Sequence, residues 1–397
     1  MLTAPKRRGL ADLPPIVSDS LLALIAMVNA DPRDDKIDVG VGVYRDGQGR
    51  TPVLRAVKEA ERRLHEAQQS KSYLGGPGDK RYAELLRPIV LGSHEADPRI
   101  VGLQTPGGCG ALFLALKLIA AANPDARVLM GTPTWPNHPP MTRGAGLEIV
   151  EYRHYDPAGR QVDFAALTAA LRGARPGDVA LLHACCHNPT GADLSDDQWR
   201  EVAGIVAERG LVPLVDFAYQ GFGRGLEEDG FGVRQMLDRC EEVLVTQSCD
   251  KNFGVYRDRV GCVFVKAPDE GLAGHVMRHL LQISREAWSM PPDHGAAVVR
   301  TVLDDEALTS DWRAELDEMR SRIHMVRRRL ASADPRLGFI AEQQGMFSML
   351  PLSPEQVKGL RERRGIYMAD SGRANLVGIA DRDLDRFCEA VVEALNG

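Results

Sequence analysis

The chain has 397 residues, of which 44% are hydrophobic and 26% charged, and its formal net charge is −6. This length exceeds the ~100–200 residues of one usual domain, so we expect at least two domains. The composition excludes a disordered chain, a fibrous repeat and a disulfide-dense scaffold. The mild acidic excess excludes a general nucleic-acid binder but not a local basic pocket for a small anion.

The cysteines and the apolar runs exclude further classes of protein. The seven cysteines are odd in number and include the adjacent pair Cys185 and Cys186, without any CxxC pair. The sequence therefore predicts neither a disulfide framework nor a metal site. The longest clean apolar run, Leu21–Val28, is far shorter than the ~20 residues of a membrane span. We interpret it as a buried amphipathic helix rather than a signal peptide, and we expect a cytoplasmic protein without a membrane partner.

The two ends of the chain differ from its middle. Residues 1–18 show no sustained periodicity and are predicted to be an N-terminal arm, followed by a helix that Asp19 caps. Residues 36–43 alternate around glycines like a strand that enters a turn. After the predicted helix Asp311–Ala331, the strands and helices become shorter. We expect a large domain over residues 51–314 and a smaller domain built from residues 19–50 and 315–397.

The middle of the chain alternates helices with short apolar strands. The predicted helices include Gly110–Ala122 and Ser195–Arg209. The predicted strands are Arg127–Met130, Val179–His183, Leu211–Val215, Glu242–Thr246 and Val260–Val265. Strands that are apolar at every position are typical of a mostly parallel sheet with helices on both faces. The fold class is therefore α/β.

A glycine-rich turn, Thr105–Gly110, opens directly into one of these helices. Backbone N–H groups at a helix N-terminus favour a bound anion, so the turn is a candidate phosphate site. It has neither the GxGxxG spacing of dinucleotide-binding folds nor the GK[ST] of a P-loop. Taken alone, such a glycine-rich turn before a helix is more often an ordinary turn.

Polar side chains follow three of the predicted strands. Asn188 lies in the loop after the first, Asp216 and Tyr219 follow the second, and Lys251 follows the third. Each alone has a simpler interpretation, as a turn residue, a helix cap or a surface lysine. Ligands of open α/β sheets bind beyond the carboxyl ends of the strands. A lysine for a Schiff base, an acid for a pyridinium nitrogen and a phosphate site together meet the requirements of pyridoxal phosphate.

The whole constellation resembles the class I aspartate and aromatic amino-acid aminotransferases, which are fold-type I pyridoxal-phosphate enzymes. The resemblance extends from about Asp19 to the C-terminus. It rests on GVGVYRDGQGRTPVL (40–54), SYLGGPG (72–78), TPGGCGAL (105–112), PTWPNH (133–138), HACCHNPTGADL (183–194), DFAYQGFGRGLEED (216–229), CDKNFGVYRDRVG (249–261), GMFS (345–348) and SGRANLVG (371–378). It implies a large domain with a mostly parallel seven-stranded sheet, a smaller α/β domain, and a homodimer with shared active sites.

The resemblance also implies how the cofactor is held. Lys251 forms the Schiff base and then moves the proton between Cα and C4′, while Asp216 holds the proton of the ring nitrogen with His183 behind it. The other implied contacts are Tyr219 and Asn188 at the ring hydroxyl oxygen, Trp135 on the ring face, and Gly108, Cys109, Ser248, Arg259 and Tyr73 of the partner subunit at the phosphate.

Substrate contacts follow in the same way. Arg373 pairs with the α-carboxylate in a bidentate fork, and Gly42 lets the backbone close on the substrate next to Trp135 and Asn188. Arg285 of the partner subunit meets a side-chain carboxylate.

This sequence departs from the family pattern at a few positions. Cys109 replaces a usual Thr or Ser, which weakens one phosphate contact, and Asp250 replaces a usual Ser directly before Lys251. We expect Asp250 to point away from the lysine. Trp288 and Met290, near Arg285, predict a roomier or more apolar substrate pocket.

The implied reaction is amino transfer from L-aspartate, phenylalanine or tyrosine to 2-oxoglutarate by a ping-pong route. A β-lyase or decarboxylase with the same cofactor is the alternative, because all these reactions start from the same Schiff base. An inert protein of the same fold is a third hypothesis, which the intact set of Lys251, Asp216 and Arg373 disfavours.

Overall fold

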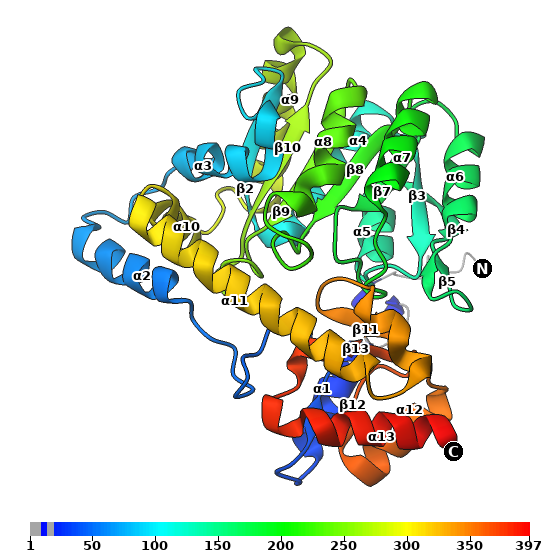
Figure 1. Ribbon diagram of the computed structural model, residues 1–397. Coiled ribbons are helices and arrows are strands. Elements are labelled where there is room, and N and C mark those ends of the chain that lie inside the picture. Colours follow the sequence, from blue (N-terminus) through cyan, green and yellow to red (C-terminus); the bar gives the residue numbers. More distant parts are fainter. Residues whose placement is uncertain (1–8, 14–19) are drawn as a thin grey trace, which may run out of the picture.

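The computed structural model of the chain describes residues 9–13 and 20–397. Its centre is a seven-stranded sheet with the order β2-β10-β9-β8-β7-β3-β4 (Figure 1). The strands are β2 (Ile100–Pro106), β3 (Arg127–Thr132), β4 (Glu148–Arg153), β7 (Val179–His183), β8 (Val212–Phe217), β9 (Val243–Ser248) and β10 (Val260–Lys266). Neighbouring strands run parallel except at β10, which is antiparallel to both β2 and β9. The predicted α/β fold class is confirmed.

Helices cover both faces of this sheet, which explains its apolar strands. In β7, Val179 and Leu181 belong to one apolar cluster, whereas Ala180 and Leu182 belong to the other. Both faces are therefore buried, as in other parallel sheets. One face packs against α4 (Gly107–Ala122), α5 (His138–Gly144) and α9 (Glu270–Ala287), and the other against α3 (Lys80–Leu91), α6 (Phe164–Gly173), α7 (Asp196–Glu208) and α8 (Phe231–Arg239).

A second, smaller core combines residues from both ends of the chain (Figure 1). Ile37 and Val39 pack there with apolar residues of the last seventy or so positions. Its elements are β1 (Ile37–Asp38), which pairs in parallel with β12 (Ile366–Tyr367), the antiparallel pair β11 (Phe347–Met349) and β13 (Arg373–Asn375), and the helices α12 (Pro354–Arg364) and α13 (Leu384–Asn396). The remaining regular elements are α2 (Arg55–Ala67), α10 (His294–Leu303), the hairpin β5 (Tyr155–Asp156) and β6 (Gln161–Val162), and short 3-10 helices.

The strand expected over residues 36–43 is shorter than expected. Only Ile37–Asp38 forms β1. The Val39 carbonyl still accepts from the Asn375 backbone, but the Val41 and Val43 carbonyls accept from a side chain, Asn375 Nδ2, at 2.7 Å each. The segment thereby leaves the sheet pattern and leads to Gly42.

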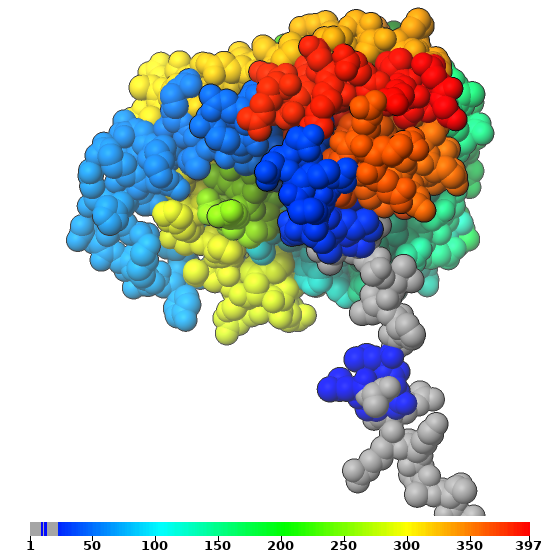
Figure 2. Space-filling model, turned by 90° about the horizontal axis from the view of Figure 1, so that it is seen from below, coloured from blue at the N-terminus to red at the C-terminus, as the bar shows by residue number. Residues whose placement is uncertain are grey.

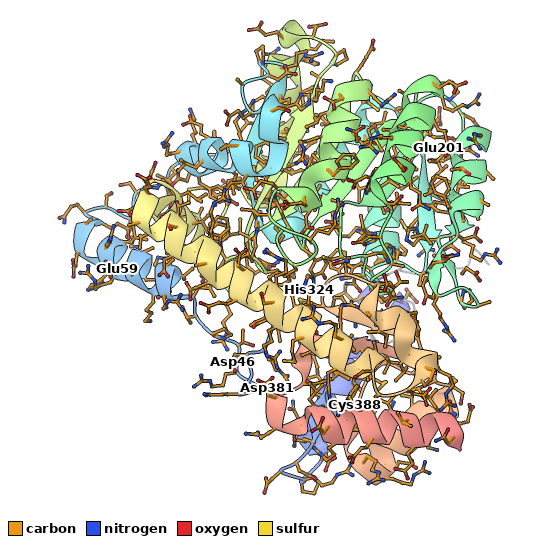
Figure 3. All side chains as sticks on the ribbon, in the orientation of Figure 1. Asp46, Glu59, Glu201, His324, Asp381 and Cys388 are labelled. Carbon is orange, nitrogen blue, oxygen red and sulfur yellow. The ribbon has the colours of Figure 1, made fainter. Side chains whose placement is uncertain are left out.

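Helix α11 (Glu306–Ala331) belongs to both cores. Trp312 and Ile323 pack in the large core, while Val326 and Leu330 pack in the small one. Near the crossing, Arg322 donates to the Arg45 carbonyl at 3.0 Å and to Asp381 Oδ1 at 2.8 Å. Asp46 and Asp381 lie close together at this junction (Figure 3). The expected domain boundary, between residues 314 and 315, falls inside this continuous helix.

Helix α1 (Ser20–Ala30) contains the apolar run Leu21–Val28, but it is less buried than predicted. Among its described side chains, Leu24 is the buried one, and Met27 is 41% exposed. Leu24 packs on Gly40, and the helix lies on the surface beside the C-terminal residues (Figure 2). The expected arm, except for residues 9–13, and the expected cap Asp19 lie outside the described residues. Within the described ranges, no helix is both long and apolar enough to cross a membrane.

Candidate active site

A cavity of about 310 Å³ lies at the carboxyl ends of β7, β8 and β9. Because these strands are parallel neighbours, the residues that follow them converge at one edge of the sheet. The cavity brings together eleven of the residues predicted from the sequence: Gly42, Gly108, Cys109, Trp135, Asn188, Asp216, Tyr219, Ser248, Lys251, Arg259 and Arg373. It is also lined by Leu112, His183, Ala218, Asp250, Tyr256 and Phe347.

The hydrogen-bond partner of Asp216 is His138, a residue to which the sequence assigned no role. His138 Nε2 lies 3.0 Å from Asp216 Oδ2, and its Nδ1 lies 2.8 Å from Thr134 Oγ1. His183, expected directly behind Asp216, packs edge-on against the His138 ring, and its Nε2 has no hydrogen-bond partner among the described residues. Because a histidine that donates through Nε2 accepts at Nδ1, Thr134 holds the tautomer that Asp216 requires.

These groups keep Asp216 ionised in a buried place. Burial alone would raise its pKa, but the His138 hydrogen bond and the nearby positive charges hold the pKa below its ordinary value. Burial lowers the pKa of His183 to about 3. His138, His183 and Asp216 bring possible ligand atoms within 4.8 Å of one another. The His138–Asp216 hydrogen bond accounts for this proximity without a metal ion.

Behind the carboxylate the imidazoles continue as a row of stacked rings. His183 and His187 have ring centroids 4.2 Å apart, and His187 stacks on His154 at 4.0 Å. Burial lowers the pKa of His154 to about 4 and that of His187 well below its ordinary value. The row is therefore uncharged near neutral pH behind the charged carboxylate.

Tyr219 and Asn188 meet at another wall of the cavity. Asn188 Nδ2 donates to Tyr219 Oη at 3.2 Å, while the buried Asn188 Oδ1 has no partner among the described residues. Burial raises the pKa of Tyr219, so its phenol stays protonated. The phenol hydrogen can therefore be donated into the cavity, to an oxygen of a bound molecule.

Lys251 extends between two aromatic rings. Its Nζ lies 5.6 Å from the ring centre of Tyr219 and 5.7 Å from that of Tyr256. The next residue is anchored from α11, where Trp312 Nε1 donates to the Asn252 carbonyl at 2.7 Å. The amine is thus directed into the cavity by a backbone that the large core holds. Tyr256 was not predicted as a site residue, although it lies in the quoted motif 249–261.

The start of α4 forms the end of the cavity where phosphate is expected. Gly107 has φ +70°, and a Cβ there would lie 2.5 Å from Arg259 Nη2. A Cβ on Gly108 would lie 3.1 Å from the Ser248 Cβ. Glycines are required here because backbone, serine and arginine approach one another so closely. Burial raises the pKa of the Cys109 thiol, which therefore offers only a weak S–H donor.

Asp250 does not point away from this end, and the expectation that it would is wrong. Its Oδ2 accepts from Arg259 Nη1 at 2.5 Å and lies 3.8 Å from Lys251 Nζ. Asp250 is only 4% exposed. The carboxylate is drawn inward because two cations flank it.

Arg373 lies on the small-core side of the cavity. Its guanidinium packs over the Phe347 ring at 4.2 Å and donates once, to the Gly40 carbonyl at 3.2 Å. Burial lowers its pKa, but an arginine keeps its charge at any ordinary pH. Gly42 completes this wall, where a Cβ would lie 3.0 Å from Phe347. Most donors of the fork thus remain for a carboxylate.

A second hollow adjoins the site and ends at the same arginine. This cleft has a volume of about 770 Å³. Trp135 and its neighbours before α5 line one wall, and Leu24, Met349 and Arg373 line the opposite wall. Trp135 borders both hollows. The cleft therefore provides an approach for a substrate with an apolar side chain.

Tyr73 and Arg285 are not part of the cavity in their own chain. Tyr73 is 91% exposed, and Arg285 is exposed near the end of α9. Trp288 packs against Phe113 with ring centroids 6.0 Å apart and likewise does not line the cavity. Met290 accepts a hydrogen bond from the backbone of Leu74. The predicted effect of Trp288 and Met290 on the pocket is not seen within one chain.

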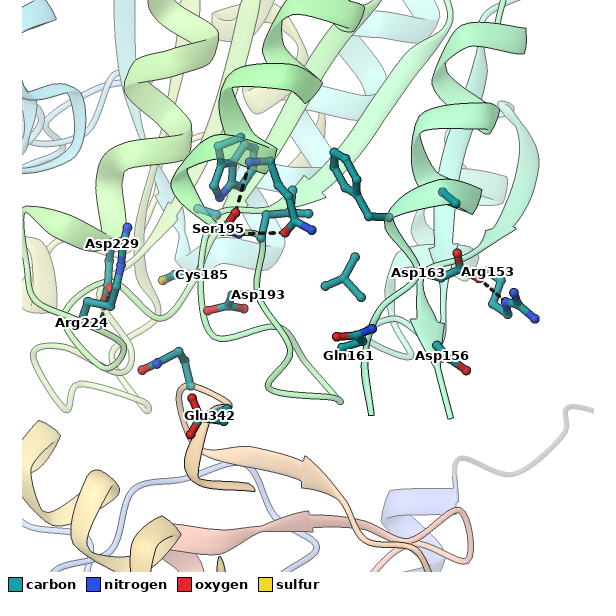
Figure 4. A pocket seen from close by; sticks show the side chains of 18 residues that line it. Arg153, Asp156, Gln161, Asp163, Cys185, Asp193, Ser195, Arg224, Asp229 and Glu342 are labelled. Atoms are coloured by element: carbon teal, nitrogen blue, oxygen red, sulfur yellow. Dashed lines mark hydrogen bonds and ion pairs between the residues drawn. The ribbon is translucent and has the colours of Figure 1, made fainter. Parts of the chain in front are cut away.

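A further pocket, of about 640 Å³, lies on the other side of the loop that carries Asn188 (Figure 4). It contains none of the predicted site residues. Its acids are used inside the fold, since Asp193 accepts the N–H groups of Cys186 and His187, and Asp229 accepts four further backbone N–H groups. These bonds shape the loop beneath the active site.

Comparison with known proteins agrees with this geometry. The family model for aminotransferase class I and II matches residues 34–391. The tyrosine aminotransferase of Rhizobium meliloti (strain 1021) is 51% identical over 91% of this chain and 94% of its own length. The aspartate aminotransferase of Escherichia coli (strain K12) is 41% identical over 95% and 98%, respectively. The aromatic-amino-acid aminotransferase of Burkholderia pseudomallei, solved covalently bound to pyridoxal phosphate, matches with a TM-score of 0.94 at 38% identity, covering 98% of this chain and 100% of that chain. The chain belongs to the aminotransferase class I and II family.

Proposed function

We propose that this chain is a pyridoxal-phosphate-dependent aminotransferase that moves the amino group of L-aspartate, phenylalanine or tyrosine to 2-oxoglutarate. The observation that carries the proposal is the single cavity that Lys251, the His138–Asp216 pair and Arg373 share. Relatives named tyrosine, aromatic-amino-acid and aspartate aminotransferase support both kinds of donor.

The cavity fits this cofactor. The glycine start of α4 leaves no room for a Cβ, Asp216 is an ionised acid, and the buried Asn188 Oδ1 lacks a partner among the described residues. Gly108, Cys109, Ser248 and Arg259 would hold the phosphate, Asp216 the ring nitrogen, Tyr219 and Asn188 the ring oxygen, and Trp135 the ring face. When bound, pyridoxal phosphate supplies an aldehyde for the amino group and a ring that draws electrons from the substrate Cα.

The chain itself binds the substrate and moves its proton. Arg373 binds the α-carboxylate, which fixes the direction of the Cα–H bond. Lys251 Nζ takes the proton from the substrate Cα as a general base and then delivers it, as a general acid, to the carbon that carried the cofactor aldehyde. Asp216 stays charged through its bond to His138. Movement of the small core, with Gly42 and Arg373, would exclude water around the bound substrate.

We further propose a cytoplasmic homodimer in which each subunit completes its partner's site with Tyr73 and Arg285. Leu74, which follows Tyr73, is 50% exposed, and Val53 is 58% exposed; such large exposed apolar side chains suit a buried interface. In this proposal each subunit has a large domain of residues 51–314 and a small domain built from residues 19–50 and 315–397. The cytoplasm suits the seven cysteines, all of which are free thiols.

A donor panel tests the reaction. The purified chain, loaded with pyridoxal phosphate, is supplied with 2-oxoglutarate and either aspartate, phenylalanine, tyrosine or lysine, and glutamate formation is measured. We expect turnover of the first three donors and none after Lys251→Ala. Absence of turnover with all of them would contradict the proposal.

Mixing two inactive variants tests the shared site. Arg285→Ala subunits and Lys251→Ala subunits are each assayed with aspartate, then mixed after mild dissociation. Random hybrids carry one intact site in half of the dimers, so about a quarter of the parental activity should return. No recovery in hybrids, verified by mass, would place Arg285 outside the partner's site.

A further inference from the structure

The phosphate end of the cavity contains a built-in anion. Asp250 is almost fully buried there, and its Oδ2 lies 2.5 Å from Arg259 Nη1. Arg259 in turn packs against the backbone of Gly107 at the start of α4. The other carboxylate oxygen, Asp250 Oδ1, is buried without a partner among the described residues. One carboxylate thus neutralises the only arginine that this end of the described cavity offers, although it bonds only the Nη1 group.

A phosphate monoester brings about 1.5 to 2 further negative charges to the same place. Arg259 has donors on both amino groups, so it can bond the carboxylate through Nη1 and a phosphate through Nη2. Its single positive charge then faces the charges of both anions. At least one anionic oxygen is left without a compensating charge, which is costly in a buried site.

We propose that Asp250 makes cofactor binding consume a proton, which bridges the Asp250 carboxylate and the phosphate. This inference rests on the proposed phosphate site. The proton comes from solvent and forms an O–H bond to one of the two oxygens, which then donates to the other, so the complex carries one negative charge fewer. Such a charge-assisted O–H···O⁻ bond is short and strong.

The charged and titratable groups that face Asp250 come from several elements. Arg259 and Lys251 are the cations near its Oδ2. Cys109 on α4, Tyr82 on α3 and Tyr256 are neutral groups close enough to sense its charge, and Asp258 adds a second, more distant carboxylate. Lys251 is committed to the cofactor aldehyde in the proposed function, so Arg259 is the one cation whose charge the two anions share.

Calorimetry with inorganic phosphate as the probe tests this proposal. The full-length protein without cofactor is titrated at about pH 8.5, where free phosphate has two charges, in two buffers of different ionisation enthalpy. The difference in heat gives the number of protons taken up. We expect about one for the parent and about none for Asp250→Asn. Above neutral pH the parent should lose phosphate affinity about tenfold per pH unit, and Asp250→Asn should not.

Asp258→Asn is the matched control, because it removes a neighbouring carboxylate that does not line the cavity. It should take up one proton, like the parent. Asp250→Ser serves as a second variant if Asp250→Asn fails to fold. A parent that binds phosphate without proton uptake overturns the proposal, as does an Asp250 variant that still takes up one proton.

Arg259→Ala separates this inference from the proposed function. If that variant binds phosphate as tightly as the parent, the phosphate site itself is misplaced. If Arg259→Ala loses phosphate binding while the parent takes up no proton, the phosphate site is correct and only the proposed role of Asp250 is wrong.

Discussion

His138 Nε2 lies 3.0 Å from Asp216 Oδ2, and neither side chain is more than 6% exposed. A hydrogen bond to a buried charged group contributes about 1.5–3 kcal/mol. His138→Phe keeps the ring volume but removes this bond. We expect kcat/KM for aspartate to fall by about 10- to 100-fold and the affinity for pyridoxal phosphate to weaken. Stopped-flow kinetics and equilibrium dialysis of the cofactor measure the two effects.

Two threonines near His138 provide the controls for that variant. Thr134→Val removes the partner of His138 Nδ1 and should cause a smaller loss of the same kind. The Thr142 hydroxyl donates to the His138 carbonyl within α5 and does not touch the imidazole nitrogens. Thr142→Val should therefore leave both measurements almost unchanged. Equal losses in all three variants would mean that helix α5, rather than the ring, is responsible.

Arg373 donates only once within the fold, so most of its fork is left for substrate. Truncation of one partner of a buried charge pair costs about 2–5 kcal/mol. Arg373→Ala should therefore lower kcat/KM by about 30- to 5000-fold with any α-amino acid. Arg373→Lys should recover little, because an ammonium cannot form the bidentate pair.

Arg361→Ala is the matched control for the Arg373 variants. The guanidinium of Arg361, on α12, donates to the exposed carboxylate of Asp370. Arg361 does not line the cavity. Its loss should leave kcat/KM within about twofold. If Arg373→Ala weakens turnover no more than Arg361→Ala, the α-carboxylate binds elsewhere.

The buried imidazoles make stability depend on pH. The folded pKa values of His154 and His183, about 4 and about 3, and the low pKa of His187 all lie below the ordinary value of 6.5. Below pH 6.5 the unfolded chain binds protons that the folded chain cannot, so stability falls as the pH falls. Each ring contributes about 1.4 kcal/mol per pH unit at most.

Asp193 acts in the opposite direction. Burial raises its pKa to about 6, so the folded chain gains this proton first and is stabilised as the pH falls from 6. The net loss from pH 6.5 to 5.5 should be about 2 kcal/mol, measured by urea unfolding. His154→Phe keeps the stack on His187 and should reduce that loss by about 1 kcal/mol, which is about half of it. An unchanged dependence in this variant would contradict the assignment to these rings.

Trp312 Nε1 donates to the carbonyl of Asn252, the residue after Lys251. Loss of this bond should therefore lower both the stability of the fold and the activity that depends on Lys251. Trp312→Phe keeps the stack on Phe253, whose ring centre lies 4.3 Å away, but leaves a buried carbonyl unpaired. We expect a loss of about 1–3 kcal/mol in the free energy of unfolding and a lower kcat. Trp199→Phe, at a buried tryptophan of α7, should spare kcat even if it destabilises the fold.

The sequence predicted most of the sheet because strands buried on both faces are apolar at every position. Strand β7 begins and ends at the predicted residues, Val179 and His183. The direction of β10 was beyond such a pattern, because an antiparallel strand buried on both faces is equally apolar. The strand-end rule found Asn188, Asp216 and Lys251 for the same topological reason.

The rule missed two residues that lie farther from their strands along the chain. His138 sits in the first turn of α5, six residues after β3 ends at Thr132, and Tyr256 lies in a loop, eight residues after β9 ends at Ser248. The signal for His138 was present in the motif PTWPNH, where a histidine lies three residues after Trp135. The side to which Asp250 points depended on Arg259, whose backbone has φ +56°. A local sequence pattern does not reveal such a long-range pairing.

Helix α11 has a mechanical consequence. Its 26 residues, about 39 Å at 1.5 Å per residue, run unbroken from the large core into the small one. We therefore expect the small core to move together with the C-terminal end of this helix. Because Trp312 on the same helix holds the loop of Lys251, we expect a shift that carries Arg373 toward a substrate to move the backbone beside the lysine as well. One continuous helix thus connects the core that holds Arg373 with the loop that positions the amine.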